Sequence, residues 1–174
     1  MLSGALAGQM YGNKASTYFQ SGWQNGLDTP GAAQLRIMKN FFAPRKWWDF
    51  VPDQSHAVVT AGYGTFSSTS AMHSNDYVTT SRTTDGSLVV AYSPFSKTLT
   101  VDMTKLAGAT TARWFDPSNG SFRAISGSPF SNSGSMNFTT PGNNADGNPD
   151  WVLVLEASAS SPAPSAPTNL RILH

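Results

Sequence analysis

The sequence has no cysteine, a single glutamate and few charged residues of either sign. The absence of cysteine excludes a disulfide scaffold, thiolate metal ligands and a cysteine nucleophile. Charged residues make up 12% of the 174 residues, the formal net charge is +1, and the 11 lysines and arginines are scattered along the chain. Nucleic acid and anionic membrane surfaces attract clustered basic residues, so we expect neither as a partner.

Long hydrophobic runs are also missing. The apolar stretch from Leu2 to Met10 is too short to span a membrane, and no basic region precedes it as in a signal peptide. The composition is nevertheless globular, because 39% of the residues are hydrophobic and 11% are aromatic. Abundant Ser, Thr, Asn and Gly are typical of secreted carbohydrate-processing proteins, and we therefore expect an extracellular or periplasmic protein.

The first segment, residues 1–53, predicts one helix over about residues 30–43. Asp28-Thr29-Pro30 supplies a capping residue followed by proline at a first helical position, and Pro44 ends the pattern. Apolar residues recur at three- and four-residue spacing, which predicts an apolar stripe along one helix face: Leu35, Ile37, Met38, Phe41 and Phe42. The adjacent Trp47 and Trp48 are expected to pack against the second segment of the chain.

The second segment, residues 54–157, consists of short apolar or alternating runs separated by turn residues. Leu99, Val101 and Met103 alternate with polar residues, which predicts a strand with one buried face. Asp85-Gly86 and the segment 116–120 carry hairpin chemistry. The pattern predicts a mainly β protein with an antiparallel β-sandwich of about eight strands: AVVTAGY, DYVTTSR, SLVVAYS, TLTVDM, TARWFDP, SFRAI, SMNFTT and DWVLVLE.

The third segment, residues 158–174, is rich in Ser, Pro and Ala. Such a composition is typical of an extended linker, because it cannot bury enough surface to fold. Its last residues, SAPTNLRIL, resemble the start of a fibronectin type III module. Both ends of the sequence therefore suggest a piece of a longer polypeptide.

Seven blocks of the sequence carry a resemblance to a known family. They occur in the order LAGQMYGN, LDTPGAAQLRIMKNFF, WWDFVPDQ, DGSLVVAYSP, TVDMTKLAG, ARWFDPSNG and DWVLVLE. This order resembles the C-terminal part of the apiosidase-like bacterial glycoside hydrolases. In that family a (β/α)8 barrel is followed by a β-sandwich called the "putative collagen-binding domain of a collagenase". The resemblance covers roughly residues 2–156.

The resemblance implies that residues 1–53 are the end of a barrel, a short α/β remnant with its eighth strand at 10–13 and its eighth helix at 30–43. Active sites of such barrels lie at the carboxyl ends of their strands, where Tyr11, Asn13 and Trp23 would line a sugar subsite. The alternative, that Tyr11 and Asn13 only end a strand, stays open.

The carboxylates of this sequence give little support for catalysis by this chain alone. Glycoside hydrolysis needs two facing carboxyl groups, and by the resemblance the family's pair lies on earlier barrel strands that this sequence lacks. The remaining candidates are Asp49, Asp53 and the single glutamate, Glu156. The two aspartates are expected instead to cap the backbone or to pair with Arg45 or Lys46.

Metal sites have equally little support. His56, His73 and His174 form no metal-binding or triad pattern, and a local hydrogen bond between Asp53 and His56 is expected instead. Asp146, Asn148 and Asp150 share the one-three-five spacing of a calcium loop, but tryptophan and alanine stand where the glycine and the last glutamate should be. We expect no cofactor.

Aromatic residues of the second segment are the remaining candidates for sugar contact, because sugar rings stack on flat apolar faces. Most of them should be core residues. Trp114 and Phe115 are adjacent, so only one of the two is expected to point inwards, and Trp114 is our stacking candidate. The aromatic candidates are Tyr63, Phe66, Tyr77, Tyr92, Trp114 and Phe122.

The sequence thus predicts the C-terminal accessory region of a secreted bacterial glycoside hydrolase, which stabilises the barrel or contacts plant or bacterial polysaccharide. The expected partners are that polysaccharide and the rest of the parent barrel, and the exposed helix stripe also allows self-association. Two alternatives stay open. One is a carbohydrate- or collagen-binding module with an exposed row of aromatics; the other is a small independent glycan hydrolase.

Overall fold

The structure, a computed structural model, describes residues 2, 21–26, 29–67 and 74–158 of the chain. Within these residues two short 3-10 helices and an α-helix precede the first strand, and another 3-10 helix follows β5. The elements are η1 (Trp23–Gly26), α2 (Pro30–Phe42), η2 (Trp47–Asp49), β1 (Phe50–Pro52), β2 (Val59–Ala61), β3 (Thr79–Thr83), β4 (Leu88–Ser93), β5 (Thr98–Asp102), η4 (Met103–Lys105), β6 (Thr110–Phe115), β7 (Phe122–Ala124), β8 (Ser135–Thr139) and β9 (Trp151–Ala157). The predicted fold class is confirmed.

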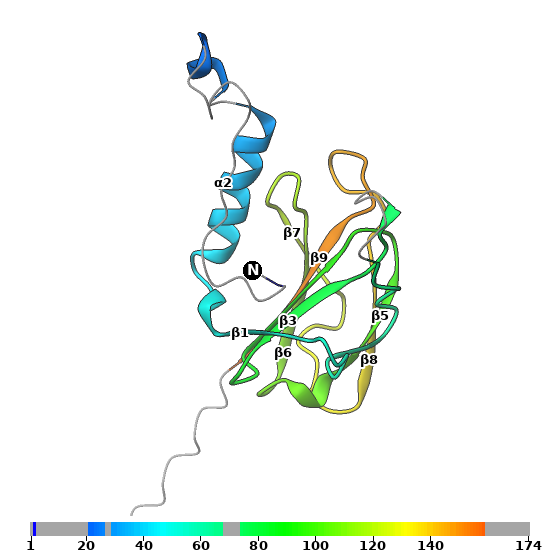
Figure 1. Cartoon of the computed structure of the whole chain (residues 1–174). Coiled ribbons are helices and arrows are strands. Elements are labelled where there is room, and N and C mark those ends of the chain that lie inside the picture. Colours follow the sequence, from blue (N-terminus) through cyan, green and yellow to red (C-terminus); the bar gives the residue numbers. More distant parts are fainter. Residues whose placement is uncertain (1, 3–20, 27–28, 68–73, 159–174) are drawn as a thin grey trace, which may run out of the picture.

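The strands form two antiparallel sheets that face each other (Figure 1). The larger sheet has the order β1-β3-β4-β9-β6-β7, and the smaller sheet has the order β2-β5-β8. All eight predicted strands are present. Strand β1 was not predicted; it lies inside the predicted first segment and pairs with β3 from Phe50↔Thr83 to Pro52↔Ser81. The larger sheet therefore begins before residue 54.

An inter-sheet core fills the space between the two sheets. Leu99 and Val101 of β5 are fully buried in it, as their alternation with polar residues predicts. From the larger sheet, Val89 points into this core from β4 and Leu153 from β9. Most members of this core are inaccessible to solvent, which shows that the two sheets close completely over each other.

A second core, the helix-side core, lies on the opposite face of the larger sheet. Val90, Phe115 and Val154 point to this face and pack with Phe41 of α2. As predicted, only one of the adjacent Trp114 and Phe115 points into the space between the sheets, but the other is not left exposed. Both are buried, because Trp114 points into the inter-sheet core and Phe115 into the helix-side core.

Helix α2 stands beside the larger sheet and begins and ends where the sequence predicts (Figure 1). Thr29 is its extended N-cap residue, Pro30 occupies the first turn, and the amide of Ala43 closes its last turn on the carbonyl of Lys39. After the helix, Trp47 packs against the helix-side core, whereas Trp48 is 61% exposed. The expected packing of Trp48 is therefore wrong.

Candidate functional site

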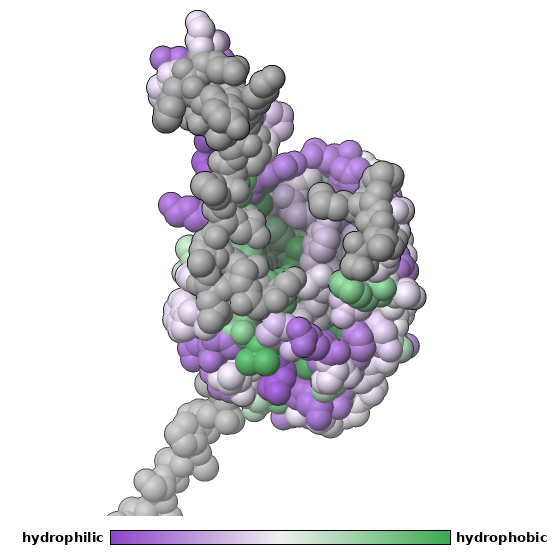
Figure 2. Space-filling view, viewed as in Figure 1, coloured by the Kyte–Doolittle hydropathy of each residue, from purple (hydrophilic) through white to green (hydrophobic). Residues whose placement is uncertain are grey.

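Helix α2 covers the larger sheet incompletely and leaves the helix-side cleft, a cavity of about 640 Å³. Leu35 and Met38 of the helix line one wall, and Val90 and Val152 of the sheet line the other. Figure 2 shows hydrophobic side chains gathered in the hollow between α2 and the sheet. The predicted apolar stripe is thus only half buried, because the helix contacts the sheet mainly through its C-terminal turns.

Polar loops form the rim of the helix-side cleft, and they include the predicted calcium ligands. The side-chain oxygen of Asn144 accepts hydrogen bonds from the amides of Asp146 and Asn148, both 3.0 Å long. Its amide nitrogen donates to a carboxylate oxygen of Asp150 at 2.7 Å. Asn144 is buried and occupies the centre of the loop. The residues whose spacing suggested a calcium site therefore fold the loop around the side-chain amide of Asn144.

Tyr92 joins this rim to the sheet. Its hydroxyl donates to a carboxylate oxygen of Asp150 at 3.3 Å. Burial, with a further contribution from the charge of Asp150, raises the pKa of Tyr92 to about 12. The phenol is therefore neutral at physiological pH and acts as a hydrogen-bond donor.

The turn after β6 forms the rest of the rim. Burial disfavours the charged form of Asp116, but hydrogen bonds outweigh it, so that the pKa of Asp116 is lowered. The donors are the hydroxyl and amide of Ser118 and the amide of Ala145. Asp116 therefore joins two loops, and the turn role predicted for it is confirmed.

A second cavity of about 570 Å³, the aromatic cleft, lies among the loops that flank β2 and β3. The ring of His56 lies flat on Tyr63, with centroids 3.6 Å apart and planes 3° from parallel. Tyr77 meets His56 edge-on at 5.8 Å, and Phe66 meets Tyr77 edge-on at 5.6 Å. Phe66 is 69% exposed. The four rings form one continuous surface.

Asp53, a predicted catalytic candidate, builds the loop that presents His56. One carboxylate oxygen accepts the amide of Ala57 at 2.8 Å, and the other accepts the amides of Val58 and Val59 at 2.9 and 3.0 Å. The amide of His56 donates to the backbone carbonyl of Asp53. The capping role predicted for Asp53 is confirmed, and the local bond to His56 is a backbone bond.

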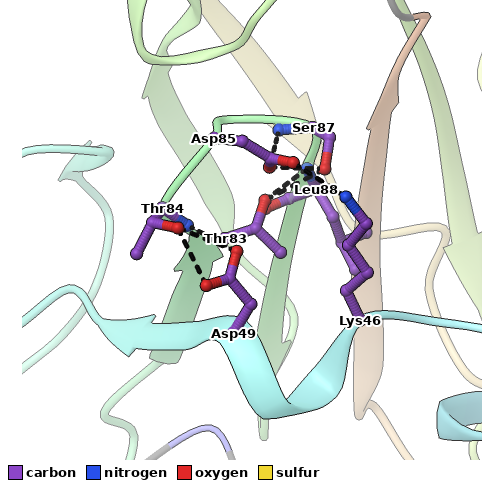
Figure 3. Close-up of polar contacts among 7 residues, drawn as sticks. All are labelled: Lys46, Asp49, Thr83, Thr84, Asp85, Ser87 and Leu88. Atoms are coloured by element: carbon purple, nitrogen blue, oxygen red, sulfur yellow. Dashed lines mark hydrogen bonds and ion pairs between the residues drawn. The ribbon is translucent and has the colours of Figure 1, made fainter.

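Asp49, the second candidate, caps the β3–β4 turn (Figure 3). Its carboxylate accepts the amide and the hydroxyl of Thr84. Lys46 pairs with Asp85 at 3.1 Å on the other side of the same turn, so of the two expected roles Asp49 has the capping role and does not pair with Lys46. Hydrogen bonds from the Ser87 hydroxyl and amide hold the pKa of Asp85 well below its usual range. The cluster is a structural turn.

Glu156, the third candidate, is bound by two arginines. Arg45 pairs with one carboxylate oxygen at 3.1 Å, and Arg113 contacts the other. Arg45 also lies over the ring of Phe41, 4.3 Å from its centroid. Burial lowers the pKa of Arg45, and the charge of Glu156 opposes this shift. Glu156 thus connects β9 to the segment after α2, and Arg45 does not pair with Asp49 or Asp53.

The structure separates the residues predicted to contact substrate. Trp114 is 3% exposed within the inter-sheet core, so its ring face is not available to a sugar. Trp23 lies in η1 and is half-buried. Tyr11 and Asn13 lie outside the described residues, as do His73, His174 and residues 159–174 of the predicted linker. The aromatic cleft instead combines Tyr63, Phe66 and Tyr77, which the sequence analysis named only within a larger set.

An acid–base pair for glycoside hydrolysis is not assembled from the predicted carboxylates. Asp146 and Asp150 do share the rim of the helix-side cleft, but Asp146 is exposed and Asp150 is engaged by hydrogen bonds from Asn144 and Tyr92. Within residues 21–26, 29–67 and 74–158, no group of three His, Asp or Glu side chains could hold a metal ion. None of the helices in these ranges is long and apolar enough to cross a membrane.

Comparison with known proteins places this fold in a family. The model of the family described as "Putative collagen-binding domain of a collagenase" matches residues 51–156. A solved structure titled "Glycoside hydrolase" is 25% identical over 78% of the chain, with a TM-score of 0.58. A glycoside hydrolase family 5 structure from Bacteroides vulgatus is 22% identical over 80% of the chain, with a TM-score of 0.56. The chain spans 27% of the length of either structure. No curated protein matches it significantly.

Proposed function

The chain belongs to the family of the "Putative collagen-binding domain of a collagenase", and on that basis we propose that it is the C-terminal accessory β-sandwich region of a secreted bacterial glycoside hydrolase. Its role is to stabilise the catalytic barrel. The proposal extends to an apiosidase-like parent enzyme, which the order of the sequence blocks supports, and to a periplasmic or extracellular location.

The observation that carries the proposal is the half-covered face of the larger sheet. The sandwich is complete between its two sheets, but on the helix side Leu35 and Met38 line an open cavity of about 640 Å³ with an apolar floor. Apolar surface that is left open in this way marks a contact with another protein unit. The matched part of this chain makes up only 27% of either solved structure, and in each of them the remaining chain is available to supply that contact.

The chain has no assembled acid–base pair of its own among the predicted carboxylates, so we expect the catalytic carboxyl groups to come from the barrel. Tyr11, Asn13 and Trp23 stay candidates for a sugar subsite at the barrel end. A second copy of the chain is the competing occupant of the helix-side cleft.

The test compares this chain with the complete product of its gene. Met38→Glu in the complete protein should lower its melting temperature while leaving kcat unchanged, because the barrel loses an apolar contact. Lys39→Gln, on the exposed face of the same helix, is the control and should leave kcat unchanged and the melting temperature nearly so, because it adds no charge to the last turn of the helix.

Two results would overturn the proposal. One is a complete gene product without a barrel. The other is reducing-sugar release by the purified chain itself that disappears on substitution of Asp49, Asp53 or Glu156. Sedimentation of the isolated chain tests the competing occupant. If a second copy fills the helix-side cleft, the chain forms a dimer, and Met38→Glu abolishes that dimer.

A further inference from the structure

We propose that the aromatic cleft binds a short stretch of a neutral polysaccharide, with Phe66 as the stacking platform and Thr80 as a hydrogen-bonding group in the cleft wall. The choice of polysaccharide as the ligand class rests on the proposed function. The site itself rests on the described residues of the loops around β2 and β3.

The exposed ring of Phe66 is the first observation. Phe66 is the most exposed of the large hydrophobic side chains in the described parts of the chain, although it lies beside other rings. The rings of Phe66 and Tyr77 are nearly perpendicular, and the high exposure of Phe66 leaves much of its ring open to solvent. A flat apolar face bordered by hydroxyl groups matches a pyranose ring, which has an apolar C–H face and polar edges.

The framework around the rings is fixed before any ligand arrives. Gly64 has a positive φ of 74°, and a Cβ at this position would lie 2.6 Å from the carbonyl oxygen of Asp76. The carboxylate of Asp76 accepts the amide of Thr65 at 3.1 Å and pairs with Lys97 at 2.6 Å. The loop that carries Phe66 is thereby fastened to the segment that carries Tyr77. A preformed cleft loses less conformational entropy when it binds a ligand.

A buried hydroxyl without a partner is the second, independent observation. Thr80 lines the cleft and is 7% exposed, and its hydroxyl makes no hydrogen bond to any described residue. Leaving such a group unpaired is unfavourable, and a hydrogen bond to a ligand hydroxyl removes this penalty. Gln54, also in the lining, adds an amide that can both donate and accept.

The charges around the cleft favour a neutral ligand. The carboxylate of Asp53 accepts hydrogen bonds from three backbone amides, and the carboxylate of Asp76 pairs with Lys97. The described residues that line the cleft include no lysine or arginine to attract an anionic chain. Its size of about 570 Å³ lies within the range of small-ligand sites and suits a few sugar units. A proline-rich peptide also stacks on aromatic rings and is the competing ligand.

Affinity electrophoresis of the chain in gels containing β-glucan, xylan, pectin or gelatin tests the proposal. We expect retardation by a neutral polysaccharide, weakened about three- to tenfold by Phe66→Ala, which removes one stacking contact. Thr80→Val should weaken binding to a similar extent without lowering the melting temperature, because the hydroxyl has no described partner in the free protein. Trp48→Ala is the matched control, since this ring is also exposed but lies outside the cleft.

Absence of retardation by both neutral polysaccharides would overturn the proposal, as would retardation that Phe66→Ala and Thr80→Val leave unchanged. Retardation only by pectin would show a charged ligand, and retardation only by gelatin would identify a proline-rich peptide; either result also rejects it. None of these outcomes bears on the contact between α2 and the barrel, which Met38→Glu tests separately.

Discussion

The two faces of the larger sheet are built by the same strands but are covered differently. On one face the smaller sheet closes the inter-sheet core, where Leu153 and Leu155 have no solvent exposure. On the other face helix α2 leaves Ile37 and Phe42 half-buried beside a cavity of about 640 Å³. This difference shows that the core between the two sheets is closed, whereas the helix side of the larger sheet is an open surface.

The neighbouring valines of β4 allow the sharpest test of this comparison, because both are fully buried and they point to opposite faces. Val89→Ala should reduce the free energy of unfolding by about 2–3 kcal/mol, since it leaves a closed cavity between the sheets. Val90→Ala should cost only about 1.5 kcal/mol, since the lost methyl groups border the existing helix-side cleft. Urea unfolding measures both, and equal losses would contradict the comparison.

Glu156→Gln should weaken the attachment of α2 to the sheet. Arg45 has a 10% exposed side chain and would lose its carboxylate partner, so we expect a loss of about 1–2 kcal/mol and faster amide exchange in α2. Lys46→Gln breaks the exposed pair with Asp85 and is the control, with a loss below about 0.5 kcal/mol. If the two variants lose equal stability, the two-arginine contact does not anchor the helix.

Tyr92→Phe should have the smallest effect at neutral pH, about 0.5–1 kcal/mol, because one long hydrogen bond to Asp150 is lost. Its pH dependence is more informative. The pKa of Tyr92 is raised to about 12 in the folded protein, so the unfolded chain releases this proton first, near pH 10. The stabilisation is complete below pH 10 and is lost as the pH rises towards about 12.

The melting temperature of the wild type should therefore fall more steeply between about pH 10 and about pH 12 than that of Tyr92→Phe. Parallel curves for the two proteins would show that the polar rim of the helix-side cleft does not isolate Tyr92 from water.

Local sequence patterns predicted the elements but not their pairing partners. Helix α2 and eight strands could be recognised because capping residues, turn residues and alternation are local signals. The missing strand, β1, spans only Phe50 to Pro52, and proline ends its pattern; its assignment depends on pairing with β3, which is distant in sequence. One usable signal was overlooked. The nearly unbroken apolar runs LVVAYS and WVLVLEA indicate strands buried on both faces.

The candidate site was less predictable, because an aromatic residue in a strand does not reveal which layer covers it. Trp114 was chosen for sugar contact but points into the inter-sheet core, while Phe66, in a loop, is exposed. His56 contacts Tyr63 and Tyr77, which lie in loops that are apart in the sequence. The carboxylate of Asp53 shapes the loop of His56 by accepting backbone amides. No rule based on residue spacing predicts these contacts.

The sequence by itself determined helix α2, the eight strands β2 to β9, the absence of thiol chemistry and the scarcity of carboxylates, because these depend on residue types and on patterns a few residues long. Tertiary structure alone decided that the larger sheet has two buried faces, that Glu156 is bound by Arg45 and Arg113, and that four rings meet in one cleft. These features depend on side chains brought together from distant segments, and their contact is fixed by the packing of layers.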